Sequence, residues 1–311
     1  MTSILRQNEK YNKFITEFTA LARMGENVSL DESRRLGRDF FLQDVVKEPV
    51  FKVEDIKIEA RDKHQIPVRI YRPSDGNLPF MVYFHRGGFV FGSVAEADPV
   101  CRKLANHLNC VIASVDYRLA PEHPFPTPMN DAYDATVGLE KYAKDASRFV
   151  VCGESAGGNL AAAVSLLARD KEGPKIDLQL LIYPVIKAKA DDQAYENSED
   201  KSFLTKDTMN FFWSMYLQNP GDERAPYSSL DLSQNLKDLP PAIVITAEYD
   251  PLRFEAQDYA QKLKNSGNAV ISKEVPKVIH GFIDMPIYTY EQKIAWIQEI
   301  NNELYKVLKI Q

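Results

Sequence analysis

The feature that most restricts the fold of this chain is a regular alternation between short apolar runs and longer stretches with helical periodicity. The strand-like runs lie at residues 51–58, 68–71, 80–84, 111–117, 149–152, 178–183, 242–247 and 269–275. Helical stretches separate most of them, at about residues 96–109, 129–144, 157–170, 252–266 and 289–308. Such alternation is typical of a parallel sheet covered by helices on both faces. We therefore predict an α/β fold with a mostly parallel, twisted, eight-stranded sheet.

Two regions break this alternation. Residues 1–45 show helical spacing, for example at Phe14 and Phe18, and contain no strand-like run. Between residues 184 and 240 no strand is evident, and residues 205–217 form an aromatic-rich stretch with helical spacing. A long insertion of this kind is usually functional, often as a lid. No repeat or linker indicates a second autonomous domain.

Charge and composition exclude several classes of protein. The chain has 311 residues, and 38 Lys and Arg against 44 Asp and Glu give a net charge of −6, which argues against a nucleic-acid-binding protein. With 44% hydrophobic and 26% charged residues, the chain is expected to be globular, and not disordered or fibrous. Cys101, Cys110 and Cys152 lack the spacing of metal ligands, so we expect buried free thiols and no metal site.

The sequence contains no evident membrane or secretory signal. Its longest apolar runs, such as residues 80–84 and 161–168, fall far short of the ~20 residues that a membrane span needs. Residues 1–13 carry several charges and no apolar segment of the secretory type. We therefore expect a cytoplasmic protein that does not bind a membrane.

The strongest local signal is the segment 153–157, which reads Gly-Glu-Ser-Ala-Gly. It follows directly on a predicted strand and precedes a predicted helix, which is the setting that a G-x-S-x-G nucleophile turn requires. Gly153 and Gly157 leave room where the strand and the helix approach each other. The start of the helix behind Ser155 also offers unpaired N–H groups to a developing oxyanion. The segment predicts Ser155 as a nucleophile.

A serine nucleophile needs a base, and five histidines compete for that role. His280 lies after the last predicted strand and before the final helix, where an α/β hydrolase carries its catalytic histidine. The other four have structural interpretations. His64 lies in a charged turn and His85 precedes two glycines. His107 lies inside a predicted helix, and His123 lies among prolines. His280 is the predicted base.

The acid that orients this base should follow the strand between the nucleophile and the base. Asp250 follows the predicted strand 242–247, and as an Asp before Pro it can also cap the next helix. One carboxylate can cap the helix and still orient the histidine. Glu248 and Asp284 remain the alternatives. The order Ser, Asp, His along the chain is the order found in α/β hydrolases.

Several further motifs give these residues a family context. A His-Arg-Gly-Gly sequence at residues 85–88 follows a predicted strand, where lipases and esterases carry an H-G-G-G loop. The chain resembles the hormone-sensitive-lipase-like branch of α/β-hydrolase esterases over roughly residues 80–282. The blocks that carry the resemblance, in order, are His85-Arg86-Gly87-Gly88, Asp116-Tyr117-Arg118-Leu119-Ala120-Pro121-Glu122-His123-Pro124-Phe125-Pro126, Gly153-Glu154-Ser155-Ala156-Gly157-Gly158, Asp250-Pro251-Leu252-Arg253 and His280-Gly281-Phe282.

This resemblance implies roles and boundaries. It implies Ser155, His280 and Asp250 as the catalytic triad. It also implies an oxyanion hole built from the backbone N–H groups of three residues, which are Gly87, Gly88 and Ala156. In the family a cap covers the active site, and the corresponding segments here are residues 1–45 and 186–235, over a core of residues 46–185 and 236–311. No metal or organic cofactor is implied.

Two positions depart from the family pattern. Arg86 replaces the usual first glycine of the H-G-G-G run, and Glu248 stands where a glycine is common. If position 86 requires a positive φ, Arg86 stores roughly 1–3 kcal/mol of strain. One interpretation is that its cation narrows the mouth of the site or favours acyl groups that end in a carboxylate. The other is that it points to solvent or pairs with an acid.

The resemblance and the residues together predict a serine carboxylesterase that hydrolyses small esters with short-to-medium acyl chains. Candidate pocket residues are Arg86, Phe203, Phe212 and Tyr183. One alternative is a hydrolase of lactones, carbamates or aryl amides. Another is a non-catalytic receptor, because plant gibberellin receptors resemble the same family but lack the catalytic histidine, which is present here. The sequence leaves open the physiological ester and the oligomeric state, with a homodimer among the alternatives.

Overall fold

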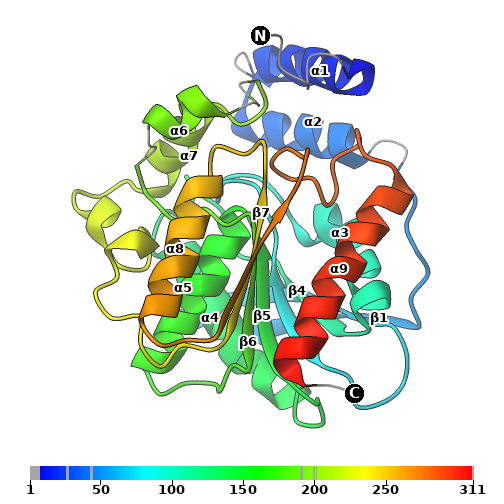
Figure 1. Cartoon of the computed structure of the whole chain (residues 1–311), viewed down its shortest axis with the longest axis vertical. Coiled ribbons are helices and arrows are strands. Elements are labelled where there is room, and N and C mark those ends of the chain that lie inside the picture. The colour runs from blue at the N-terminus through cyan, green and yellow to red at the C-terminus, as the bar shows by residue number, and fades with distance from the viewer. Residues whose placement is uncertain are drawn as a thin grey trace.

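An eight-stranded sheet forms the centre of the molecule (Figure 1). The computed structural model describes residues 8–25, 28–42, 45–189, 192–198, 200 and 202–309. The strands are β1 (Lys52–Glu59), β2 (Gln65–Arg72), β3 (Phe80–Phe84), β4 (Val111–Val115), β5 (Phe149–Glu154), β6 (Leu178–Ile182), β7 (Ala242–Ala247) and β8 (Val270–Val275). All eight coincide with the predicted strand-like runs, so the predicted fold class is confirmed.

The helices also follow the predicted pattern. In the described residues they are α1 (Glu9–Gly25), α2 (Leu30–Leu42), α3 (Val94–Leu108), α4 (Thr127–Leu139), α5 (Ala156–Asp170), α6 (Asp192–Asn197), α7 (Lys206–Tyr216), α8 (Arg253–Asn265) and α9 (Tyr290–Leu308). Short 3₁₀ turns occur at η2 (Glu140–Tyr142), η3 (Asp222–Arg224) and η4 (Leu230–Leu232). The six-residue helix α6 is too short to leave a periodic signal, so the sequence pattern does not predict it.

The strand order is β1-β2-β4-β3-β5-β6-β7-β8, and every pair from β4 to β8 is parallel. Strands β1 and β2 pair antiparallel with each other, and β2 pairs antiparallel with β4. In the centre, Val82 of β3 lies between Ala113 of β4 and Val151 of β5. Because parallel strands end at the same edge of a sheet, the loops after β3, β5, β7 and β8 converge there.

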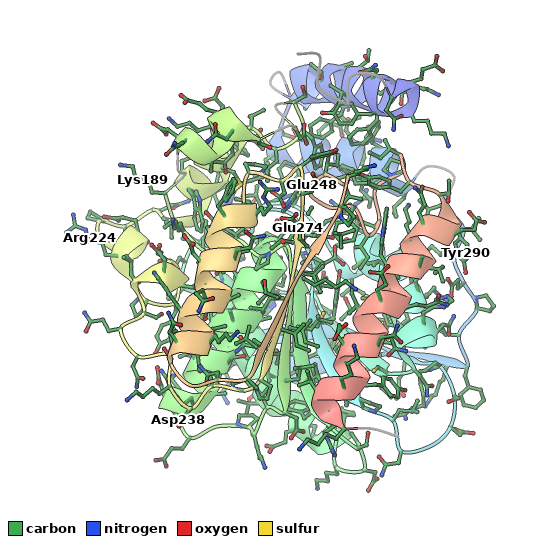
Figure 2. All side chains as sticks on the ribbon, in the orientation of Figure 1. Lys189, Arg224, Asp238, Glu248, Glu274 and Tyr290 are labelled. Atoms are coloured by element: carbon green, nitrogen blue, oxygen red, sulfur yellow. The ribbon has the colours of Figure 1, made fainter. Side chains whose placement is uncertain are left out.

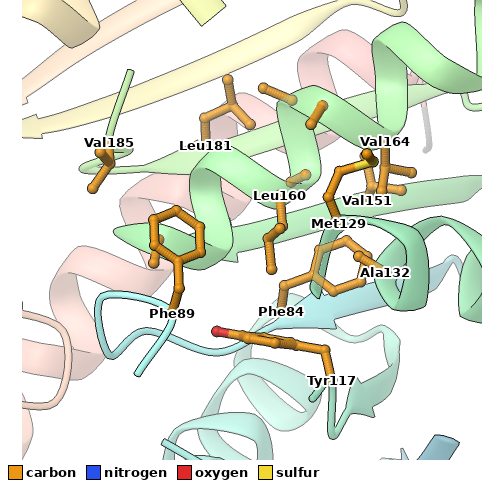
Figure 3. Packing of buried hydrophobic residues seen from close by; sticks show 14 of the residues in the cluster. Phe84, Phe89, Tyr117, Met129, Ala132, Val151, Leu160, Val164, Leu181 and Val185 are labelled. Carbon is orange, nitrogen blue, oxygen red and sulfur yellow. The ribbon is translucent and has the colours of Figure 1, made fainter. Parts of the chain in front are cut away.

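Alternating side chains of the buried strands feed two apolar layers. Phe84 belongs to the layer under α4, α5 and α8, whereas Tyr83 belongs to the layer under α3 and α9. Figure 3 shows part of the first layer, where Phe84 lies among Leu160 of α5 and Met129 of α4. Strands β3 to β7 are buried on both faces, which explains why they read as continuous apolar runs.

The predicted strand at residues 111–117 is two residues too long. Strand β4 ends at Val115, because the next two side chains bind loops instead of extending the ladder. The Asp116 carboxylate accepts from the Val94 N–H at 2.9 Å, and the Tyr117 hydroxyl donates to the His85 carbonyl at 2.8 Å. Both contacts fix the loop that follows β3.

Helices α1, α2, α6 and α7 lie at one end of the sheet (Figure 1). Phe203, ahead of α7, packs against Phe18 of α1 with ring centroids 5.0 Å apart. The Tyr11 hydroxyl donates to the buried Asp200 carboxylate at 2.6 Å. Contacts therefore join the two segments predicted to form a cap, although parts of them, such as residues 1–7, lie outside the described residues. Within the described residues, no helix combines the length and apolarity needed to cross a membrane.

Candidate active site

Ser155 lies on a sharp turn between β5 and α5. Its φ of +55° and ψ of −118° are unusual for a residue other than glycine. A side chain at Gly153 would collide with the Gly157 carbonyl, and one at Gly157 would collide with the Phe84 carbonyl. The two glycines therefore let the turn form and leave Ser155 at its apex.

His280 connects Ser155 to Asp250. Its Nε2 lies 2.9 Å from the Ser155 Oγ, and its Nδ1 lies 2.7 Å from the Asp250 Oδ2. The other oxygen of Asp250 accepts from the Leu252 N–H at 2.9 Å. All three side chains are buried, with His280 only 5% exposed. With Nδ1 donating to the carboxylate, Nε2 is the acceptor for the serine hydroxyl, so the arrangement can move a proton off the oxygen.

The alternative acids have other partners. Glu248, at the end of the sheet below α2 in Figure 2, accepts from the Lys277 N–H at 2.7 Å. Asp284 accepts from the Arg86 Nε at 2.9 Å. Among the carboxylates of the described residues, Asp250 is the one that hydrogen-bonds to His280.

Two of the remaining histidines have structural surroundings. His85 is buried, stacks on Tyr117 with centroids 4.2 Å apart and donates from Nδ1 to the Arg86 carbonyl at 2.8 Å. Burial lowers the pKa of His85, which favours the neutral ring. His107 lies 3.2 Å from a carboxylate oxygen of Glu48 on another part of the surface.

The start of the loop after β3 lies against the start of α5, since a side chain at Gly157 would collide with the Phe84 and His85 carbonyls. Gly87 and Gly88 adopt φ values of +128° and +62°, whereas Arg86 is not among the residues with positive φ. The strain considered for Arg86 therefore does not arise. Within the described residues, neither the Gly87 nor the Gly88 N–H donates to another group of the protein. Ala156 is the first residue of α5, where N–H groups have no acceptor within the helix.

The four expected pocket residues have different surroundings. Phe212 of α7 lies directly over the loop that follows β3, since a Cβ at Gly88 would collide with its ring. Phe203 instead packs against α1, as described above. Tyr183 is also a packing residue. It is 1% exposed, and its hydroxyl donates to Glu154 at 2.7 Å because it lies in the layer under α3 and α9.

Arg86, the fourth expected pocket residue, forms an ion pair with Asp284. Its guanidinium also stacks over the Phe41 ring of α2, 4.6 Å from the centroid. Of the two interpretations of Arg86 from the sequence, the structure therefore favours pairing with an acid. Asp284 lies 198 residues away, so no local pattern in the sequence indicated this partner.

Nothing in the sequence indicated that two carboxylates near the site, Glu154 and Glu255, are buried. Glu154, next to Ser155, accepts from the Tyr83 and Tyr183 hydroxyls, and burial raises its pKa to about 7. Glu255 accepts from the Ile186 N–H at 2.7 Å, and burial raises its pKa to about 8. Within the described ranges, no group of three His, Cys, Asp or Glu side chains could hold a metal ion.

Comparison with known proteins shows the family to which the chain belongs. A family profile described as alpha/beta hydrolase fold matches residues 81–284, a range that includes Ser155, Asp250 and His280. The chain belongs to the α/β-hydrolase family. The match covers more than half of the chain. It begins in β3 and ends at Asp284, the residue that pairs with Arg86.

Several similar proteins are named as esterases. Carboxylesterase NlhH from Mycobacterium tuberculosis is 35% identical over 250 residues, which cover 77% of this chain and 78% of the relative. An arylesterase from Saccharolobus solfataricus is 34% identical over 281 residues, covering 88% and 91%. A solved hyperthermophilic esterase from the archaeon Pyrobaculum calidifontis is 40% identical, with a TM-score of 0.83 and coverage of 90% and 94%. The predicted resemblance to hormone-sensitive-lipase-like carboxylic ester hydrolases is confirmed.

Proposed function

We propose that this chain is a serine carboxylesterase with Ser155 as nucleophile, His280 as general base and Asp250 as its orienting acid. The observation that carries the proposal is the position of the His280 ring between the Ser155 Oγ, at 2.9 Å, and the Asp250 carboxylate, at 2.7 Å. Serine is a weak nucleophile, and such a chain of hydrogen bonds activates it.

In acylation, the Ser155 oxygen attacks the carbonyl carbon of the ester while His280 takes the serine proton. The carbonyl oxygen becomes an oxyanion, which the N–H groups of Gly87, Gly88 and Ala156 stabilise. When the tetrahedral intermediate collapses, the C–O bond to the alcohol breaks and His280 returns its proton to the leaving alcohol. The acyl group stays on Ser155.

In deacylation, a water molecule takes the place of the alcohol. His280 removes its proton as it attacks the acyl-enzyme, and the same N–H groups hold the second oxyanion. The bond between the acyl carbon and the Ser155 oxygen then breaks. The acid leaves, and Ser155 regains its proton from His280. Asp250 keeps the imidazole in the required tautomer and stabilises the imidazolium.

We assign the substrates to small esters with short-to-medium acyl chains. The Phe212 ring over Gly88 limits the space beside the oxyanion loop. Residues 1–45 and 186–235 form the proposed cap over a core of residues 46–185 and 236–311. The names of the two relatives, carboxylesterase and arylesterase, support the same class of substrate. A cytoplasmic location and a homodimer stay predictions.

Hydrolysis of p-nitrophenyl acetate, butyrate, octanoate and palmitate tests the proposal. We expect turnover of the shorter esters by the purified protein and loss of turnover in Ser155→Ala, because that variant lacks the nucleophile. If the wild-type protein and Ser155→Ala hydrolyse every ester at the same rate, the proposed function is wrong. Turnover of lactones, carbamates or aryl amides with none of esters would instead favour the alternative hydrolases.

A further inference from the structure

The groups proposed to act on the ester come from loops that the sheet holds far apart. The oxyanion loop follows β3 and the His280 loop follows β8, with β5, β6 and β7 between them. At about 4.8 Å per strand, the ends of β3 and β8 are roughly 19 Å apart. The ladder of backbone hydrogen bonds therefore does not set the distance between these two loops directly.

An ion pair between Arg86 and Asp284 joins the two loops. The Arg86 Nε lies 2.9 Å from one carboxylate oxygen of Asp284 and 3.2 Å from the other. The Arg86 side chain is 23% exposed and the Asp284 side chain 17% exposed, so solvent screens the pair only in part. Burial lowers the pKa of Arg86, but the nearby carboxylates of Asp284 and Glu154 raise it more, so the net pKa is raised. The pair is a charged hydrogen bond between two loops.

Both ends of the pair are short distances along the chain from the reacting groups. Arg86 directly precedes Gly87, and its carbonyl accepts from the buried His85 ring at 2.8 Å. Asp284 follows His280 by four residues, and its N–H donates to the Gly281 carbonyl at 3.2 Å. A shift at either end is therefore transmitted over very few bonds.

Further contacts fix both partners from outside. The Arg86 guanidinium stacks on Phe41 of α2, and the Asp284 carbonyl accepts from the Lys293 Nζ of α9 at 3.2 Å. These contacts limit the ways in which either side chain can turn away. The pair therefore links the oxyanion loop to the His280 loop through atoms that are themselves held in place.

We propose that Arg86 and Asp284 are a pair of positioning residues, which keep the oxyanion loop at the correct distance from His280 during ester hydrolysis. This inference rests on the proposed function. Misplacement of a catalytic group by about 1 Å can cost about 10²-fold in rate. The Arg86 charge is already paired with Asp284, which argues against a role in binding a substrate carboxylate.

A double-mutant cycle tests the pairing. Arg86→Met and Asp284→Asn should each lower kcat for p-nitrophenyl butyrate about tenfold, with KM changed less than twofold, because the oxyanion is a feature of the transition state. The double variant should lose about as much as either single variant, since both remove the same link. Arg86→Lys, which keeps the charge, should recover part of kcat. Arg224→Met is the matched control and should behave as wild type, because this arginine, labelled in Figure 2, is 84% exposed and pairs with the adjacent Glu223.

A second measurement separates positioning from a general loss of structure. An aryl trifluoromethyl ketone forms an oxyanion on the serine, so its inhibition constant should rise about tenfold in Arg86→Met and in Asp284→Asn. A structural role alone would lower the melting temperature and leave the inhibition constant of the folded fraction unchanged. That result would overturn the proposal.

Other outcomes also decide the matter. If the losses of kcat multiply in the double variant, or if the single variants are as active as the wild type, the positioning role of Arg86 and Asp284 is wrong. The esterase proposal would remain intact. Arg86→Met that loses activity only on a hemisuccinate ester would make Arg86 a substrate-binding residue instead. If the wild-type protein does not hydrolyse esters at all, the proposed function itself fails.

Discussion

Asp250 uses its two carboxylate oxygens for two different partners. One oxygen lies 2.7 Å from the Nδ1 of His280, and the other accepts from the Leu252 N–H at 2.9 Å. The first contact sets the tautomer of the imidazole, whereas the second holds the turn that leads into α8. The two roles can be separated by a substitution that preserves the shape of the side chain.

Asp250→Asn should lower kcat by about 10³–10⁴-fold, the effect expected when the histidine is held in the wrong tautomer. The stability should change little, because the amide oxygen can still accept from the Leu252 N–H. Steady-state kinetics with p-nitrophenyl butyrate and a thermal melt of the same sample measure the two effects.

Glu248→Gln is the matched control for that substitution. Glu248 accepts from the N–H of Lys277, which lies between the end of β8 and His280, and a glutamine oxygen can keep that bond. We expect kcat within about threefold of wild type, because the side chain does not hydrogen-bond to the histidine. A loss as large as that of Asp250→Asn would mean that the orienting acid has been assigned to the wrong residue.

Phe212→Ala should widen the proposed acyl site. Its ring lies against Gly88, so its removal frees space beside the oxyanion loop. We expect the ratio of kcat/KM for p-nitrophenyl octanoate over acetate to rise roughly tenfold, the size of effect typical of altered pocket volume. Phe211→Ala, at the 39% exposed neighbouring side chain, should leave the ratio unchanged. Equal ratios in Phe212→Ala and wild type would place the acyl group elsewhere.

Arg34→Ala should loosen α2 from the core. The Arg34 side chain donates to the carbonyls of the buried residues Val90 and Ala120, each at 2.9 Å. Loss of both bonds should reduce the free energy of unfolding by about 1–3 kcal/mol and expose α2 to protease. Urea unfolding and limited proteolysis measure these changes.

Arg35→Ala is the control for Arg34→Ala. The ion pairs of Arg35 in the described residues are to Glu32 and Asp39, within α2 itself. Its removal should change the free energy of unfolding by less than about 0.5 kcal/mol. Equal effects of the two substitutions would show that the contacts of Arg34 across to Val90 and Ala120 do not hold α2 in place.

Glu255→Gln should change how stability depends on pH. Burial raises the folded-state pKa of Glu255 to about 8, above the ~4.3 of an unfolded chain, so the folded protein binds the extra proton between these values. The wild type should therefore lose stability relative to Glu255→Gln as pH rises from about 5 to about 8, by up to about 1.4 kcal/mol per pH unit. The glutamine oxygen can keep the Ile186 and Lys187 bonds.

Urea unfolding at several pH values measures that difference. Glu172→Gln, at an exposed carboxylate, should give a curve parallel to that of wild type. A difference between wild type and Glu255→Gln that stays constant, or grows in favour of wild type as pH rises, would contradict the prediction.

The sequence predicted best where one physical signal was strong and local. The five central strands were found because a strand buried on both faces needs an unbroken apolar run, whereas β1 and β2 at the edge show alternation of buried and exposed side chains. The Ser155 turn was found because a strand, two glycines and a helix leave their mark within a few residues. Errors occurred at the ends of elements. Residues 116 and 117 are compatible with a strand, but their side chains bind the loop after β3 instead.

Contacts between side chains that are distant along the chain could not be predicted from local sequence patterns. The sequence singled out Arg86 as a departure and Asp284 as an alternative acid, yet nothing local joined the two. Tyr183 was expected to line a pocket. It lies just after β6 with a positive φ, and its side chain enters the apolar layer under α3 and α9, where the hydroxyl donates to Glu154.

The sequence by itself therefore determined the class of fold, the family and the residues proposed to carry out acyl transfer, since these depend on periodicity and short motifs. Only the tertiary structure decided that Arg86 pairs with Asp284, that Glu248 supports a loop and that Phe212 covers Gly88. The physical reason is that such contacts depend on where separate strands and helices end in space. That arrangement results from packing of the whole core, and no short segment of the chain encodes it.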